Sequence, residues 1–165
     1  ARSRLAQLSS EVAAKLEFSQ GDICTVDLGQ KFDVAIALFH VINYQTTNQR
    51  LQDFFGTARK HLKPEGILIF DFWYGTAVLS DRPSIRVKRL ENDRVKIIRI
   101  AEPVMYPQQN LVEVNYQILI TDKSNGNVRE LKESHQMRYL FMPEIELLLK
   151  PVSYTHLTLP TNREV

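Results

Sequence analysis

Two short apolar runs joined by one amphipathic stretch constrain the fold of this chain more than any other feature. The first run extends from Phe32 to Leu38, and the second from Gly66 to Phe72. The stretch between them, residues 48–62, repeats apolar residues at helical spacing, namely Leu51, Phe54, Phe55, Ala58 and Leu62. Near-continuous apolar strands are typical of a parallel sheet covered by helices on both faces. We therefore predict an α/β fold with a Rossmann-like parallel sheet, in which residues 63–66 form the turn into the second strand.

The chain after Trp73 changes to one extended segment after another. In residues 111–122 apolar and polar side chains alternate, which predicts one apolar and one solvated sheet face. Asn125 and Gly126 supply the turn residues of a hairpin. The segments that we expect to be strands are Ser84–Leu90, Val95–Ala101, Leu111–Asp122 and Val128–Leu140. Together they predict an inserted antiparallel sheet.

Both ends of the chain look cut. Residues 2–16 place apolar residues on one helical face without a capping residue before them, and residues 16–23 alternate as a short strand that ends at an acidic turn. A helix with proline in its first turn is predicted from Met142 to Lys150. Residues 152–165 resemble the translated read-through of a sequencing adapter, a contaminant of metagenomic assemblies, so we expect a non-native tail there.

These boundaries predict three native parts and the tail. They are the C-terminal part of the parallel-sheet core at 1–82, the antiparallel insertion at 83–141, a returning core helix at 142–150, and the tail at 152–165.

Composition narrows the possible partners. The 165 residues are 44% hydrophobic and 24% charged, which is ordinary for a globular domain. A net charge of +2 without a basic block does not favour nucleic acid, and no run approaches the roughly 20 apolar residues that span a bilayer. The single cysteine, Cys24, excludes an internal disulfide and fits a reducing, cytoplasmic compartment. No His, Asp or Glu cluster has metal-ligand spacing, so no metal is expected, and the oligomeric state is left open.

Polar and aromatic residues follow the end of each apolar run. Phe39, His40, Asn43 and Tyr44 follow the first run, while Asp71, Trp73 and Tyr74 close the second. In open parallel sheets, ligands bind beyond the carboxyl ends of the strands. We therefore expect the chemistry of this protein at that edge.

Four segments then resemble a class I S-adenosylmethionine-dependent methyltransferase, in the small-molecule branch that inserts an antiparallel sheet after the fifth strand. They read GDI, FDVAIALFHVINY, LKPEGILIFDFW and RYLFMPEIELLLK, and the resemblance covers residues 1–150. The family's first strand with its glycine-rich loop, and the acid that closes its second strand, have no counterpart here. The resemblance thus implies a partial Rossmann-like sheet without its first two strands, truncated at both ends. We expect this piece alone to be inactive, poorly soluble and a negligible binder of S-adenosylmethionine.

The resemblance also implies the residues that line the cofactor site. Asp22 matches the acid that accepts a hydrogen bond from the adenine amino group, and Ile23 matches an apolar wall with a backbone donor. Leu38, Phe39 and His40 match the segment beneath the methionine portion. Asp22 has a structural alternative, because a turn aspartate commonly binds its own backbone.

A methyl transfer needs a base only where a proton must leave the acceptor. We nominate His40 as that base because its free pKa lies near neutrality, and the alternative is a histidine hydrogen-bonded to its own loop. Six further side chains are candidate acceptor contacts, each with a structural alternative in a loop, a sheet junction or a solvated strand. They are Asn43, Tyr44, Trp73, Tyr74, His135 and Arg138.

The resemblance therefore implies a fragment of a methyltransferase that acts on an amine or hydroxyl of a small molecule or sugar. Two alternatives stay open at this point. One is a nicotinamide-dependent oxidoreductase on a related sheet, which the antiparallel insertion disfavours. The other is a non-catalytic binding domain. The sequence upstream of Ala1 would separate the three.

Overall fold

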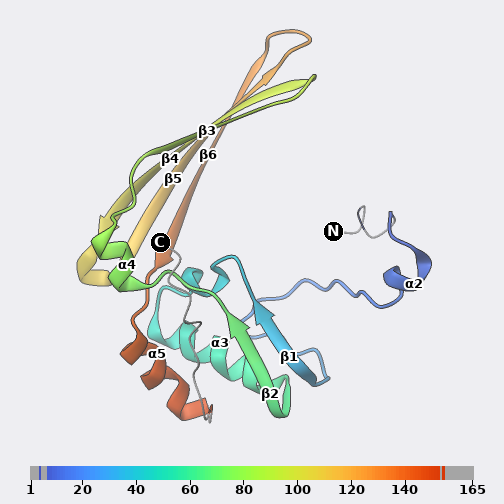
Figure 1. Ribbon diagram of the computed structural model, residues 1–165, viewed down its shortest axis with the longest axis vertical. Coiled ribbons are helices and arrows are strands. Elements are labelled where there is room, and N and C mark those ends of the chain that lie inside the picture. Colours follow the sequence, from blue (N-terminus) through green and yellow to red (C-terminus); the bar gives the residue numbers. More distant parts are fainter. Residues whose placement is uncertain (1–3, 5–6, 153, 155–165) are drawn as a thin grey trace.

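A strand–helix–strand unit lies in the lower half of the molecule as drawn in Figure 1. The computed structural model describes residue 4, residues 7–152 and residue 154. Within them, strand β1 (Phe32–Ala37) leads through helix α3 (Asn48–Lys60) to strand β2 (Leu62–Phe70). The strands are parallel, with Val34 opposite Ile67 and Ile36 opposite Ile69. The predicted α/β fold with a parallel sheet is confirmed.

The predicted turn at residues 63–66 is wrong in one respect, because it lies inside β2. The pairing shifts there, from Phe32 opposite Leu62 to Val34 opposite Ile67, and Glu65 adopts a left-handed backbone with φ of 62°. The turn residues therefore make an irregularity in the strand while Leu62, which we placed at the end of the helix, pairs with Phe32.

One face of the parallel sheet packs on α3 and on the returning helix α5 (Met142–Leu149). Thr47 begins α3 by accepting a hydrogen bond from the backbone N–H of Arg50 at 3.2 Å. Ala37, Leu68 and Phe70 pack from the sheet onto the buried cluster. That cluster is Cys24, Ile42, Leu51, Phe54, Phe55, Leu140, Ile145, Leu148 and Leu149.

The other face of the parallel sheet is open among the described residues. Val34 is 43% exposed, Ile36 62%, Ile67 58% and Ile69 48%. We predicted helices on both faces, so this prediction is corrected: the described helices cover only one. Both faces are nevertheless apolar, because the apolar runs are nearly continuous.

The predicted antiparallel sheet follows, and its four strands lie in the order β3–β4–β5–β6. Its strands are β3 (Arg86–Glu91), β4 (Val95–Tyr106), β5 (Leu111–Asp122) and β6 (Val128–Arg138). In Figure 1 the sheet rises from the core as a long twisted ribbon, with the short helix α4 (Gly75–Ser80) at its base. β4 is longer than predicted because its pairing with β5 continues to Tyr106 opposite Leu111. The predicted apolar face is confirmed, since Val112 and Val114 are buried against Trp73, Val78 and Tyr139.

The two sheets meet where β6 returns to the core. Gly75 donates its N–H to the carbonyl of Leu140 at 2.8 Å, and Leu140 donates to the carbonyl of Trp73 at 2.9 Å. A side chain at position 75 would have its Cβ 2.5 Å from the ring of Phe141, so only glycine fits this approach.

No helix among the described residues has the length and apolar content needed to cross a membrane.

The N-terminal predictions need correction. Helix α2 covers only Ser10–Ala13 and is capped by Ser9, and residues 1–3 and 5–6 lie outside the described residues. Residues 16–22 form no strand, because no described strand lies beside them to complete a ladder. Most of the expected tail at residues 152–165 lies outside the described residues. Of its described residues, Tyr154 packs its ring 6.4 Å from that of Phe55, and Val152 also lies against the core.

Candidate functional site

The carboxyl end of β1 is a tight turn held by Asp71. Phe39 and His40 both have left-handed backbones, with φ of 63° and 60°, which costs a residue other than glycine about 1–2 kcal/mol. The Asp71 carboxylate accepts the backbone N–H of Phe39 at 3.2 Å and that of His40 at 2.9 Å. These charge-assisted hydrogen bonds offset part of that cost. The turn leaves the side chain of Phe39 86% exposed at the sheet edge.

His40 lies between Asp71 and Trp73. Its Nδ1 is 3.5 Å from the Asp71 carboxylate, and its ring meets the Trp73 ring edge-on with centroids 6.0 Å apart. The structure thus brings together three residues that we selected from two strand ends. Tyr74, the next selected residue, is 44% exposed and contacts the ring of Phe72 edge-on.

Asn43 joins the two strand ends to the antiparallel sheet. This fully buried residue lies in a short 3-10 helix, η1 (Val41–Tyr44). Its amide nitrogen donates to the backbone carbonyl of Arg138 on β6, while its amide oxygen accepts the backbone N–H of Trp73 at 3.2 Å. Both ends of the amide therefore hold the backbone of other segments.

Arg138 holds the same junction from the other side. Its guanidinium donates to the Glu144 carboxylate at the start of α5. It also donates to Asn48 Oδ1 at 2.7 Å and to the carbonyl of Thr46 at 3.3 Å. These contacts connect β6 with the starts of α3 and α5.

Tyr44 and His135 meet across the junction. The Tyr44 hydroxyl is 3.1 Å from Nδ1 of His135, and Nε2 of His135 is 3.3 Å from the Glu133 carboxylate. The ring of Tyr116 lies edge-on to His135, with centroids 5.4 Å apart. Burial raises the pKa of the Tyr44 phenol, and the nearby Tyr116 and Glu133 raise it further. Tyr44 is therefore a neutral phenol at physiological pH.

Sequence reasoning selected Tyr44 and His135 but missed Tyr116 and Glu133. Tyr116 lies opposite Glu133 in the β5–β6 register, and Glu133 is two residues from His135 on the same face. The alternation within residues 128–138 indicates that Glu133 and His135 share a face of the sheet. That Tyr116 lies beside them follows only once the register of the hairpin is known.

Asp22 lies beside the first turn of α3. Its carboxylate accepts the backbone N–H of Cys24 at 2.9 Å, and each of its oxygens is 3.1 Å from Nη2 of Arg50. The Cys24 N–H and the Arg50 guanidinium lower the pKa of Asp22. Arg50 also donates to Gln45 at 2.8 Å, which places Asp22 near the segment that follows β1. The turn contact that we gave as the structural alternative is present, and a role toward adenine stays a prediction.

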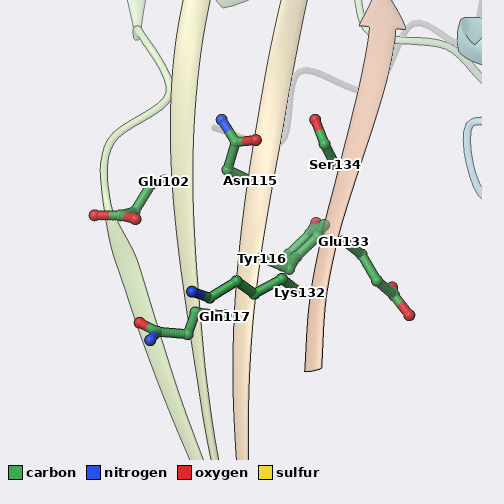
Figure 2. Close-up of a pocket in the computed structure, with 7 residues that line it drawn as sticks. All are labelled: Glu102, Asn115, Tyr116, Gln117, Lys132, Glu133 and Ser134. Carbon is green, nitrogen blue, oxygen red and sulfur yellow. The ribbon is translucent and has the colours of Figure 1, made fainter. Parts of the chain in front are cut away.

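A cavity of about 430 Å³ lies along the antiparallel sheet (Figure 2). Its side chains are mostly polar and come from three adjacent strands. They are Glu102, Asn115, Tyr116, Gln117, Lys132, Glu133 and Ser134. In Figure 2 the Lys132 side chain runs across β5 toward Gln117. Two of the lining residues, Tyr116 and Glu133, also contact His135, through the edge of the Tyr116 ring and through the Glu133 carboxylate.

The residues at the sheet edge fit the chemistry of S-adenosylmethionine. The exposed ring of Phe39 offers an apolar surface, and the Asp71 carboxylate with the rings of His40 and Trp73 offers a negative and aromatic environment for a sulfonium cation. No group of three or more His, Cys, Asp or Glu side chains that could hold a metal ion occurs in the part of the chain that the structure describes.

Solved structures share this fold. The sugar N-methyltransferase KedS8 from Streptoalloteichus sp ATCC 53650 is 18% identical with a TM-score of 0.75, over 89% of this chain and 56% of that one. DesVI from Streptomyces venezuelae is 20% identical with a TM-score of 0.71, over 81% and 55%. An S-adenosylmethionine-dependent methyltransferase from Clostridium acetobutylicum ATCC 824 is 21% identical with a TM-score of 0.66, over 92% and 60%.

No family model matches the chain, and no curated protein does. The chain spans less than two thirds of the length of these solved structures. The fold is that of S-adenosylmethionine-dependent methyltransferases, as the resemblance implied.

Proposed function

We propose that the whole protein to which this chain belongs transfers a methyl group from S-adenosylmethionine to an amine or hydroxyl of a small molecule or sugar. The observation that carries this proposal is the junction at Asn43, which binds the backbone of both Arg138 and Trp73. It fixes the antiparallel sheet beside the carboxyl ends of β1 and β2. The shared fold with a sugar N-methyltransferase supports the acceptor class.

The cofactor side of the site is proposed to comprise two segments. Asp22 and Ile23 lie beside α3, where we place the adenine, while Leu38, Phe39 and His40 lie at the turn held by Asp71, where we place the methionine portion. S-adenosylmethionine supplies an electrophilic methyl group when bound. In this proposal, Asp71 holds the backbone of the turn at Phe39 and His40 next to that methyl group, and its own carboxylate supplies a negative charge nearby.

The acceptor side is proposed to lie under the antiparallel sheet. Tyr44, Trp73, Tyr74 and His135 present rings and polar groups there, while the contacts of Asn43 and Arg138 suit them to holding these segments in place. Two proton acceptors belong to this region, the imidazole of His40 and the Tyr44–His135 pair. We propose a small-molecule acceptor and a cytoplasmic location, in keeping with the low net charge and the single cysteine.

Calorimetric titration with S-adenosylhomocysteine tests the proposal. The complete reading frame should bind one equivalent, whereas the present chain alone should show no measurable heat of binding. A folded complete protein that binds a nicotinamide dinucleotide instead would identify an oxidoreductase. One that binds neither ligand would identify a non-catalytic domain.

A further inference from the structure

We propose that Tyr44 takes the proton that the methyl acceptor loses, with His135 as the next proton acceptor and Glu133 as the group that fixes the tautomer of His135. The proposal rests on the proposed methyl transfer and adds the path of the proton. The hydrogen-bond geometry itself is independent of which substrate is methylated.

Both ring nitrogens of His135 have partners. A carboxylate only accepts hydrogen bonds, so the contact of 3.3 Å between Nε2 and Glu133 requires the proton on Nε2. The neutral ring then has a lone pair on Nδ1, which accepts the hydroxyl proton of Tyr44 at 3.1 Å. A carboxylate behind a histidine fixes both the tautomer and the ring orientation in this way.

The position of Tyr44 suits a group that meets the acceptor. It is the last residue of η1, four residues after His40 and next to the buried Asn43, and its side chain is 45% exposed. Because its hydroxyl proton points at His135, the lone pairs of the oxygen are left to accept a proton from an amine or hydroxyl. The contacts of Asn43 to β6 and to Trp73 fix the backbone on which Tyr44 stands.

The charged and titratable groups around His135 come from several elements. Tyr44 approaches from η1, Tyr116 from β5 and Glu133 from β6 itself. From β4, the Arg99 guanidinium lies 5.3 Å from the centre of the Tyr116 ring. Glu133 is therefore the anion that would compensate the charge of a protonated His135.

The lone pair of the acceptor nitrogen or oxygen forms the bond to the methyl carbon, and the carbon–sulfur bond breaks with its electron pair left on sulfur. The acceptor proton moves to the oxygen of Tyr44 while the Tyr44 proton moves to Nδ1 of His135. The product is an imidazolium at His135, paired with the Glu133 carboxylate. Nδ1 of this imidazolium later returns its proton to solvent through Tyr44.

The contact of His40 with its carboxylate is longer. The distance from Nδ1 to Asp71 is 3.5 Å, beyond a good hydrogen bond, and the Asp71 carboxylate already accepts two backbone N–H groups. The Tyr44–His135 pair therefore has the better-defined proton path of the two.

Nitrogen-15 NMR of the histidine rings tests the geometry without any substrate. In the present chain, the neutral ring of His135 should be the Nε2–H tautomer. Tyr44→Phe should shift the Nδ1 signal of His135, and Glu133→Gln should raise the share of the Nδ1–H tautomer. Gln136→Ala, one residue away on the opposite face of β6, should leave the ring signals unchanged. A predominantly Nδ1–H ring in the unchanged protein would overturn the proposal.

Kinetics of the complete protein test the proton path, with methyl transfer to glucosamine and other amino sugars as the assay. Tyr44→Phe should lower kcat about 100-fold with little change in KM, as expected for loss of a general base. His135→Gln should lower kcat roughly tenfold, in line with a residue that acts through Tyr44. An unchanged kcat in Tyr44→Phe would contradict the proposal. Failure of the complete protein to bind S-adenosylhomocysteine would instead overturn the proposed function, while the NMR result would still be readable.

Discussion

The parallel and the antiparallel sheet of this protein place their apolar side chains differently. In the parallel sheet both faces are apolar, and the face with Ile36 and Ile69 is open among the described residues. In the antiparallel sheet Val112 and Val114 are buried, while the opposite face carries polar residues such as Asn115 and Gln117 and lines the cavity in Figure 2. An alternating strand needs one covering layer, whereas a continuous apolar strand needs two. The parallel sheet thus has an apolar face without cover among the described residues, whereas Val112 and Val114 of the antiparallel sheet are covered by Trp73, Val78 and Tyr139.

Asn43→Ala should have the largest effect because it breaks the link between the sheets. It leaves the carbonyl of Arg138 and the N–H of Trp73 without their partner in a buried place. Since each of these two unsatisfied groups costs about 1–3 kcal/mol, we expect a loss of about 2–6 kcal/mol in the free energy of unfolding. Urea denaturation measures it.

Asn115→Ala is the matched control for that experiment. Asn115 lies on the polar face of β5, so its loss should change the free energy of unfolding by less than about 0.5 kcal/mol. Equal effects of the two substitutions would mean that Asn43 does not join the sheets as the structure indicates.

The elements of both sheets could be predicted from the sequence because their patterns are local. Continuous apolar runs identified β1 and β2, and alternation identified β5 with its bounds at Leu111 and Asp122. The prediction of a short strand at residues 16–23 was wrong because it also relied on a local pattern. Alternation alone does not supply the neighbouring strand with which a strand must pair.

The candidate site could be predicted only in part. The strand ends gave His40, Asp71 and Trp73, which do lie together. Glu133 and Tyr116 could not be assigned because their place beside His135 depends on the register of β5 and β6, which the sequence does not state. The strands themselves could therefore be predicted, whereas the contacts that depend on their register could not.

Ile36→Thr combined with Ile69→Thr sharpens the contrast between the open and the covered sheet face. Both side chains are about half exposed or more, and threonine keeps the strand preference of isoleucine. Exposed apolar patches favour association. We therefore expect the dissociation constant of self-association to rise about tenfold, which corresponds to about 1.4 kcal/mol. Sedimentation velocity measures it. Val128→Thr, which changes a 61% exposed residue of β6, should not alter self-association, and an equal effect there would refute the contrast.

Tyr139→Phe tests the packing under the antiparallel sheet. Tyr139 is fully buried, and no group among the described residues forms a hydrogen bond with its hydroxyl. Removing an unpaired buried hydroxyl should leave the free energy of unfolding unchanged or raise it by up to about 1 kcal/mol. Tyr106→Phe is the control of opposite sign, because the Tyr106 hydroxyl donates to Glu113 at 3.1 Å. A clear loss of stability in Tyr139→Phe would show that the hydroxyl has a partner.

Titration of Tyr44 should give the smallest effect, and it probes the contact between η1 and β6 directly. Burial, Tyr116 and Glu133 raise its pKa above the ordinary value of 10.0, so the folded protein keeps the phenol protonated to higher pH than the unfolded chain does. The associated stabilisation is fully present below pH 10 and is lost as the pH rises through the raised pKa. The difference in ultraviolet absorbance between the protein and Tyr44→Phe isolates this ionisation. Glu133→Gln should move it part of the way back, and an unshifted Tyr44 would place the phenol in solvent, away from β6.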